Sequence, residues 1–168
     1  TQSAWAGSYP RLLKKSGYHT GFVGKYGVGN KMTEARKTFD FWRGFAGQGR
    51  FLDPKRPNNQ HLTALQGDQS LEFLRTVPAD KPWCLSVSFK AVHCQDGAKR
   101  QFPPDARDEN MFSGITIPPA PLSDPAIFQS LHEPLKNSES RRRWEIRFSP
   151  TLYQETVKDY YRLLFGVD

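Results

Sequence analysis

The apolar residues of the first 29 positions predict a helix followed by a strand. Trp5, Tyr9 and Leu13 recur at helical spacing, and Gly17 stands where a glycine commonly closes a helix. Residues 17–29 then carry the β-branched and aromatic side chains of a short strand, followed by the glycines of a turn. The N-terminal segment therefore predicts one helix–strand unit.

The same order of elements recurs further along the chain. Apolar side chains fall on one side of a helical projection over residues 61–77, and Pro78 ends that helix. Residues 83–89 alternate large apolar with small side chains, as in a strand with one tightly covered face. His61, at the start of the helix, is expected to be solvated. Two helix–strand units favour a parallel sheet and predict an α/β fold.

An aromatic segment lies between the two units. Phe39, Phe41 and Phe51 stand among glycines, which predicts a loop attached to the core by its aromatic side chains. Gln48 and Arg50 of this loop are within reach of a substrate in some arrangements, but the abundance of aromatic residues favours a structural role.

Residues 95–149 show no sustained periodicity. Seven prolines interrupt the segment, so no long element is expected there. Long insertions of this kind are often functional, because they frame binding pockets. The arginine run 141–143 has two readings, contact with an anionic substrate or a solvated basic face, and the second is favoured.

The last part of the chain predicts a helix with a wide apolar stripe. Ser149 is expected to cap it and Pro150 to occupy its first position. Apolar and aromatic residues from Tyr153 to Leu164 follow helical spacing. We expect this stripe to be buried against another part of the protein.

Composition is that of a loop-rich globular chain. The 168 residues are 37% hydrophobic and 13% aromatic, with 13 glycines and 13 prolines, and one domain accommodates them. No apolar run has the length needed to cross a bilayer, so no membrane partner is expected. No signal-peptide pattern opens the sequence, which begins without methionine, and we therefore expect a processed or partial chain.

The net charge of +7 favours acidic partners, which include nucleic acid, anionic glycans and sulfated compounds. No RRM, helix-turn-helix or zinc-finger pattern is present, so nucleic acid is not the expected partner. A basic module that binds an anionic polymer without catalysis is the alternative from another functional class. Cys84 lies in an apolar run and is expected to be a buried small residue, and with Cys94 it forms no zinc-binding pair.

Two residues stand where the predicted strands end. Lys25 stands just past the end of the first strand, and His93 follows the second. Ligands of open α/β sheets bind beyond the carboxyl ends of the strands, and a lysine ammonium offers three donors to a tetrahedral anion. Taken singly, these positions favour a solvated surface lysine and a structural histidine over a ligand-binding pair.

Three phrases carry a resemblance to a known family. Residues 17–26, Gly-Tyr-His-Thr-Gly-Phe-Val-Gly-Lys-Tyr, resemble the second signature of the sulfatase family, within the alkaline-phosphatase-like superfamily. Residues 39–45 resemble its Gly-Phe-Asp-x-Phe-x-Gly-Phe segment, and residues 85–93 resemble its segment ending Ala-Pro-His. This chain departs from the family at Gly27, often a histidine, and at Val92, usually a proline.

The resemblance implies a partial alkaline-phosphatase/sulfatase-like sandwich with parallel strands, helices and long Pro-rich loops. It implies sulfate ester hydrolysis, with Lys25 and His93 binding the sulfate and assisting the leaving group. The substrate would be a sulfated small molecule or glycan, and the compartment periplasmic, secreted or lysosomal. A phosphonate or phosphate monoester hydrolase of the same superfamily is the alternative. Oligomeric state is not indicated.

The family also uses calcium, or another divalent cation, and a formylglycine made within a Cys/Ser-x-Pro-x-Arg motif. Neither Cys84 nor Cys94 is followed by x-Pro-x-Arg, and no Asp-Asp or Asp-Asn pair occurs in the sequence. No metal-ligating residue is therefore assigned in this chain. We expect residues 1–168 to be the middle part of a sulfatase catalytic domain, inactive alone, with the nucleophile and metal segments outside it.

Overall fold

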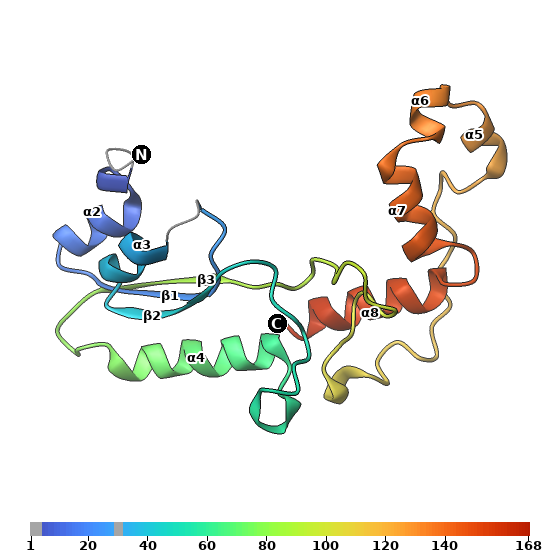
Figure 1. The fold of residues 1–168 in the computed structure, drawn as a ribbon. Coiled ribbons are helices and arrows are strands. Elements are labelled where there is room, and N and C mark those ends of the chain that lie inside the picture. The colour runs from blue at the N-terminus through green and yellow to red at the C-terminus, as the bar shows by residue number, and fades with distance from the viewer. Residues whose placement is uncertain (1–4, 29–31) are drawn as a thin grey trace. The chain divides into compact units, whose positions relative to one another are not determined.

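The computed structural model describes residues 5–28 and 32–168. The last glycine of the predicted turn, Gly29, lies outside this part. The chain divides into two compact units, residues 1–93 with Val167 and residues 94–166 with Asp168 (Figure 1). Within the described part, no helix is both long and apolar enough to cross a bilayer.

The first unit is built on a three-stranded parallel sheet. Its strands are β1 (His19–Lys25), β2 (Phe41–Phe45) and β3 (Trp83–Ser88), in the order β2-β1-β3. The predicted parallel α/β arrangement is confirmed. The prediction that the aromatic segment is a loop is wrong in part, since five of its residues form β2. Aromatic side chains favour strands. Here the backbone of β2 adds a strand to the sheet, and its aromatic side chains pack against the faces of that sheet.

Helices cover both faces of this sheet. Helices α2 (Tyr9–Lys15) and α3 (Met32–Thr38) lie on one face, and α4 (Leu62–Thr76) lies on the other (Figure 1). The predicted closure of α2 is confirmed, because Gly17 adopts a left-handed φ of +87° just past its end. A short 3₁₀ turn, η1 (Pro57–Asn59), precedes α4.

Two apolar layers hold the first unit together. On the α4 side, the buried side chains of Val23, Phe41 and Phe73 pack against one another. On the opposite side, the rings of Phe22 and Trp42 stack with centroids 4.9 Å apart. Both layers include side chains of β1. The removal of these side chains from water therefore stabilises the whole first unit.

The second unit contains more regular structure than the proline pattern predicts. Its elements are η2 (Ala106–Asp108), α5 (Pro125–Gln129), α6 (Glu133–Lys136), α7 (Glu139–Phe148) and α8 (Tyr153–Phe165). The prolines of α5 and α6 stand in their first turns, where proline is tolerated. The side chain of Ser138 caps α7 by accepting from the Arg141 N–H at 3.2 Å. The expectation of no long element is therefore wrong.

Arg142 and Arg143 of the arginine run are exposed on α7, as the favoured reading predicted, whereas Arg141 is partly buried over the Phe128 and Trp144 rings. Arg142 and Arg143 both donate to Glu139, at 2.6 and 2.7 Å, and Arg141 pairs with Glu145 at 2.9 Å. Hydrogen bonds from Arg142 and then Arg143 lower the pKa of Glu139 to about 2. These pairs neutralise much of the charge that the sequence presents as a basic run.

Helix α8 differs from its prediction at both its start and its buried face. It begins at Tyr153, because Ser149 instead ends α7. The buried side chains include those of Asp159 and Arg162, whereas Tyr161 is 46% exposed. The predicted burial of the apolar stripe is therefore wrong. Charged groups occupy the interior because they have partners there.

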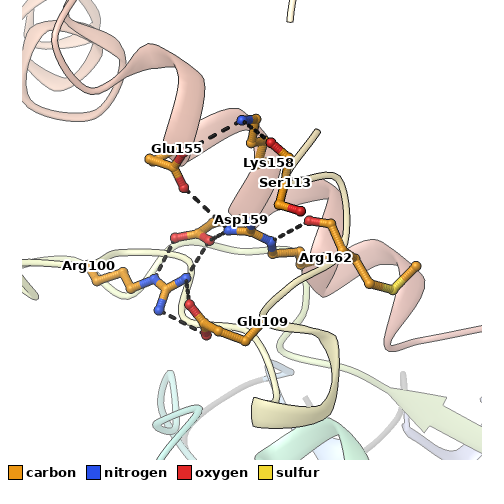
Figure 2. A network of polar contacts seen from close by, with 8 residues as sticks. Arg100, Glu109, Ser113, Glu155, Lys158, Asp159 and Arg162 are labelled. Carbon is orange, nitrogen blue, oxygen red and sulfur yellow. Dashed lines mark hydrogen bonds and ion pairs between the residues drawn. The ribbon is translucent and has the colours of Figure 1, made fainter. Parts of the chain in front are cut away.

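Those partners form a connected polar network (Figure 2). Asp159 accepts from Arg100 through two hydrogen bonds of 2.6 Å and from Arg162 at 2.7 Å. Arg100 also donates to Glu109 at 3.0 Å. The Arg162 Nε donates to the carbonyl oxygen of Met111 at 2.9 Å, and Lys158 and Glu155 complete the network at its edge. Asp159 thus joins α8 to the irregular segment before it.

We predict that Asp159→Asn lowers the free energy of unfolding by about 3–5 kcal/mol, because the buried Arg162 loses its closest ion pair and retains only the 3.5 Å pair with the exposed Glu155. Urea denaturation followed by circular dichroism measures this change. Glu155→Gln in the same helix is the control, since Glu155 is 69% exposed and its removal costs less than about 1 kcal/mol. Equal effects of the two variants would contradict a buried, stabilising Asp159.

Candidate functional site

Lys25 and His93 line the same cavity, which has a volume of about 1450 Å³. The cavity lies within the first unit, at the carboxyl ends of β1 and β3 and beside α2 and α3. The structure therefore brings together the two residues that the sequence singled out. Their roles toward a ligand stay predictions.

The position of Lys25 depends on a close approach between two strands. Gly24, the residue before it, lies opposite Ser88 in the sheet and has a φ of +107°. A Cβ atom at Gly24 would stand 2.1 Å from the carbonyl oxygen of Ser88 and 2.4 Å from the Gln66 side-chain nitrogen. Only glycine fits this backbone and this spacing. Gly24 thus fixes the position of Lys25 at the end of β1.

The side chain of Lys25 is oriented by a neutral partner. Its Nζ donates to Oε1 of Gln48, in the loop after β2, at 2.7 Å. An amide oxygen orients the ammonium without cancelling its charge, unlike a carboxylate. Among the described residues, no carboxylate forms an ion pair with Lys25. Lys25 is therefore available to offset the charge of an anion.

His93 ends a short turn that follows β3. Its backbone N–H donates to the carbonyl oxygen of Lys90 at 2.8 Å. Lys90 also lines the cavity and is only 2% exposed, and its ammonium lies 4.9 Å from the centre of the Phe51 ring. A cation that lies over an aromatic face is attracted to the ring, and this attraction offsets part of the hydration that the cation loses on burial. The turn that carries His93 is thus fixed through Lys90, a residue for which the motifs indicate no role.

Below Lys90, the Phe51 ring stacks on His61 with centroids 5.3 Å apart. His61 is buried and caps α4, where its ring accepts from the Thr63 N–H at 3.3 Å. The prediction of a solvated His61 is therefore wrong. A histidine at a helix start offers both a capping nitrogen and a flat apolar face, and here both are used.

The cavity combines cations with an aromatic wall. Arg11, Lys25 and Lys90 line it with His93, and Glu34 is the acidic residue among its lining groups. Six aromatic side chains contribute to the wall: Trp5, Tyr9, Phe22, Tyr26, Phe39 and Phe89. Such a surface suits an anionic group attached to a larger body with apolar faces.

The described residues do not supply a metal centre. Among residues 5–28 and 32–168, no group of three or more His, Cys, Asp and Glu side chains is placed to hold a metal ion. Cys84 and Cys94 form no disulfide in the described part of the chain and are both partly exposed, so the expected burial of Cys84 is wrong. The donor set of this part of the chain does not fit the divalent cation that the family resemblance implies.

We predict opposite effects for two glycine substitutions in the first unit. Gly24→Ala lowers the free energy of unfolding by about 2 kcal/mol or more, through left-handed strain and the clash with Ser88. Gly67→Ala raises it by about 0.5–1 kcal/mol, because Gly67 lies inside α4 with open space around it. Urea denaturation of both variants tests the comparison, and a tolerated Gly24→Ala would disprove the tight strand approach.

Comparisons with known proteins agree with these features. The sulfatase family model matches residues 7–168. N-acetylglucosamine-6-O-sulfatase of Bacteroides thetaiotaomicron is 28% identical over 128 residues, which are 70% of this chain and 21% of that protein. The chain therefore spans about a fifth of the length of this curated relative. Because the family match covers nearly all of its residues, the chain belongs to the sulfatase family.

Proposed function

We propose that Lys25 and His93 bind the sulfate group of a sulfated sugar and assist its hydrolysis. The observation that carries this proposal is that both residues line one cavity at the carboxyl ends of neighbouring parallel strands. Each residue has an ordinary structural reading when taken alone. Their convergence in a member of the sulfatase family favours the functional reading.

The proposed reaction breaks the bond between sulfur and the ester oxygen of the sugar. Water supplies the oxygen that ends on sulfur, and the sugar oxygen gains a proton as it leaves. The ammonium of Lys25 offsets negative charge on the sulfate oxygens as that bond breaks. Protonated His93 donates the proton to the leaving oxygen. The two residues therefore act on opposite sides of the same bond.

A sulfated sugar fits the lining better than a bare anion does. The cavity has an extensive aromatic wall, which a free sulfate ion does not contact usefully. The curated relative is, by its name, a sulfatase of N-acetylglucosamine 6-sulfate. We therefore take this sugar sulfate as the reference ligand.

The attacking group and the divalent cation are proposed to come from segments outside these 168 residues. Cys84 and Cys94 lack the motif that the family converts to formylglycine. No step is assigned to either group here. The 168-residue chain alone is accordingly proposed to bind the sugar sulfate without turning it over.

We predict that Lys25→Ala and His93→Ala each weaken binding of N-acetylglucosamine 6-sulfate about tenfold or more, because each removes a charge-assisted hydrogen bond. Titration of the 168-residue chain followed by NMR measures the affinity, and circular dichroism checks the fold. Lys81→Ala is the control, since this exposed lysine precedes β3 and does not line the cavity.

Unchanged affinity in both variants would refute the proposal. A parallel titration with N-acetylglucosamine 6-phosphate addresses the related chemistry. If the phosphate binds more tightly at the same pH, and depends on the same two residues, the phosphate monoester alternative replaces the sulfate assignment.

A further inference from the structure

Arg11 is a cation of the cavity that the proposed chemistry does not use. It stands in the first part of α2 and lines the same cavity as Lys25 and His93, which come from the strand ends. Among the described residues, no carboxylate forms an ion pair with Arg11. Its guanidinium adds a full positive charge to a wall distinct from the one that carries Lys25.

The helix that carries Arg11 is anchored at two points. The Tyr9 hydroxyl and Ser86 Oγ of β3 form a hydrogen bond of 2.5 Å. The indole nitrogen of Trp5, just before α2, donates to Oγ1 of Thr38 in α3 at 3.2 Å. Both contacts join the helix to the sheet and to its neighbour on the same face. The backbone that carries Arg11 is therefore already ordered, and only its side chain loses freedom when it binds a ligand.

The size of the cavity leaves room beyond a single sugar. Sites for small molecules usually measure roughly 300–1,000 Å³. The volume of about 1450 Å³ is above that range. The aromatic residues Trp5 and Tyr9 line it together with Arg11, so its α2 end has both flat apolar faces and a charge. A second sugar ring with its own anionic group matches this combination.

We propose that Arg11 binds a second anionic group of the substrate, a carboxylate or a second sulfate on the sugar next to the one that carries the cleaved sulfate. This inference rests on the proposed function of Lys25 and His93. A singly sulfated sugar has one negative charge, and Lys25 and His93 bind the group that carries it. The planar guanidinium presents paired donors to two oxygens of one anionic group, a geometry that suits either candidate. The site accordingly selects sugars with two anionic groups.

Three disaccharides of equal length test this assignment. Each contains N-acetylglucosamine 6-sulfate joined to a second sugar, which is glucose, glucuronate or glucose 6-sulfate. Isothermal titration of the 168-residue chain at a fixed salt concentration gives the affinities, because salt alone alters the binding of polyanions. We expect one or both doubly charged ligands to bind about tenfold or more tightly than the glucose form. The ligand with the larger gain identifies the group that Arg11 accepts.

Arg11→Gln should remove this gain and weaken the binding of the glucose disaccharide far less than that of the doubly charged ligands. Arg11→Glu should make the doubly charged ligands bind more weakly than the glucose form. Arg75→Gln is the matched control, because Arg75 is an exposed arginine in the last turn of α4 that does not line the cavity. It should leave all three affinities unchanged, which separates a local contact from the attraction of a basic chain.

Three results overturn the assignment: equal wild-type affinity for all three ligands, an equal loss for all three in Arg11→Gln, or the same loss of gain in Arg75→Gln. A failure of the underlying function looks different. In that case Lys25→Ala leaves the affinity for the glucose disaccharide unchanged, whatever Arg11→Gln does. The two proposals can therefore fail separately.

Discussion

The pairing of β1 with β3 at Gly24 and Ser88 is the constraint on which the candidate site depends. A side chain at Gly24 would meet the carbonyl oxygen of Ser88, so the two strands pack closely only with glycine there. Because the strands are parallel and in register, Lys25 and the turn leading to His93 both lie at the carboxyl end of the sheet. The backbone geometry at Gly24 and Ser88 therefore places Lys25 and His93, which are 68 positions apart in sequence, at the same end of the sheet.

The two units are stabilised in physically different ways. In the first, apolar side chains on both faces of β1 are removed from water, and the site is supported by the stack of Lys90, Phe51 and His61. In the second, a carboxylate shared by two arginines joins α8 to the segment before it. A charged interior of this kind is sensitive to the loss of any one partner, whereas an apolar core loses stability in proportion to the volume removed.

The sequence predicted the parts of the structure that follow local rules. The αβ units, the end of α2 at Gly17 and the position of Lys25 depend on periodicity, glycine conformation and strand composition. It did not predict β2, since alternation over five aromatic-rich residues is weak evidence for a strand. The buried face of α8 was also missed, because one of the two arginines that pair with the buried Asp159 is Arg100, which is 59 positions away. His61 was misjudged, and Lys90 was assigned no role, for the same reason: both residues contact Phe51 in the folded chain.

At Gly27 the chain departs from the family signature and has no side chain at the candidate site. Gly27 lines the cavity, and a side chain there would meet no atom within 4 Å, so the position is open space within the cavity. Where the family often has a histidine next to the ligand, this chain has volume instead. Positive charge is still present, because Arg11 lines the cavity from α2. Under the proposed function, the open space at Gly27 and the cation on α2 suit an anionic ligand with a large body, because electrostatic attraction acts across a gap that a hydrogen bond does not span.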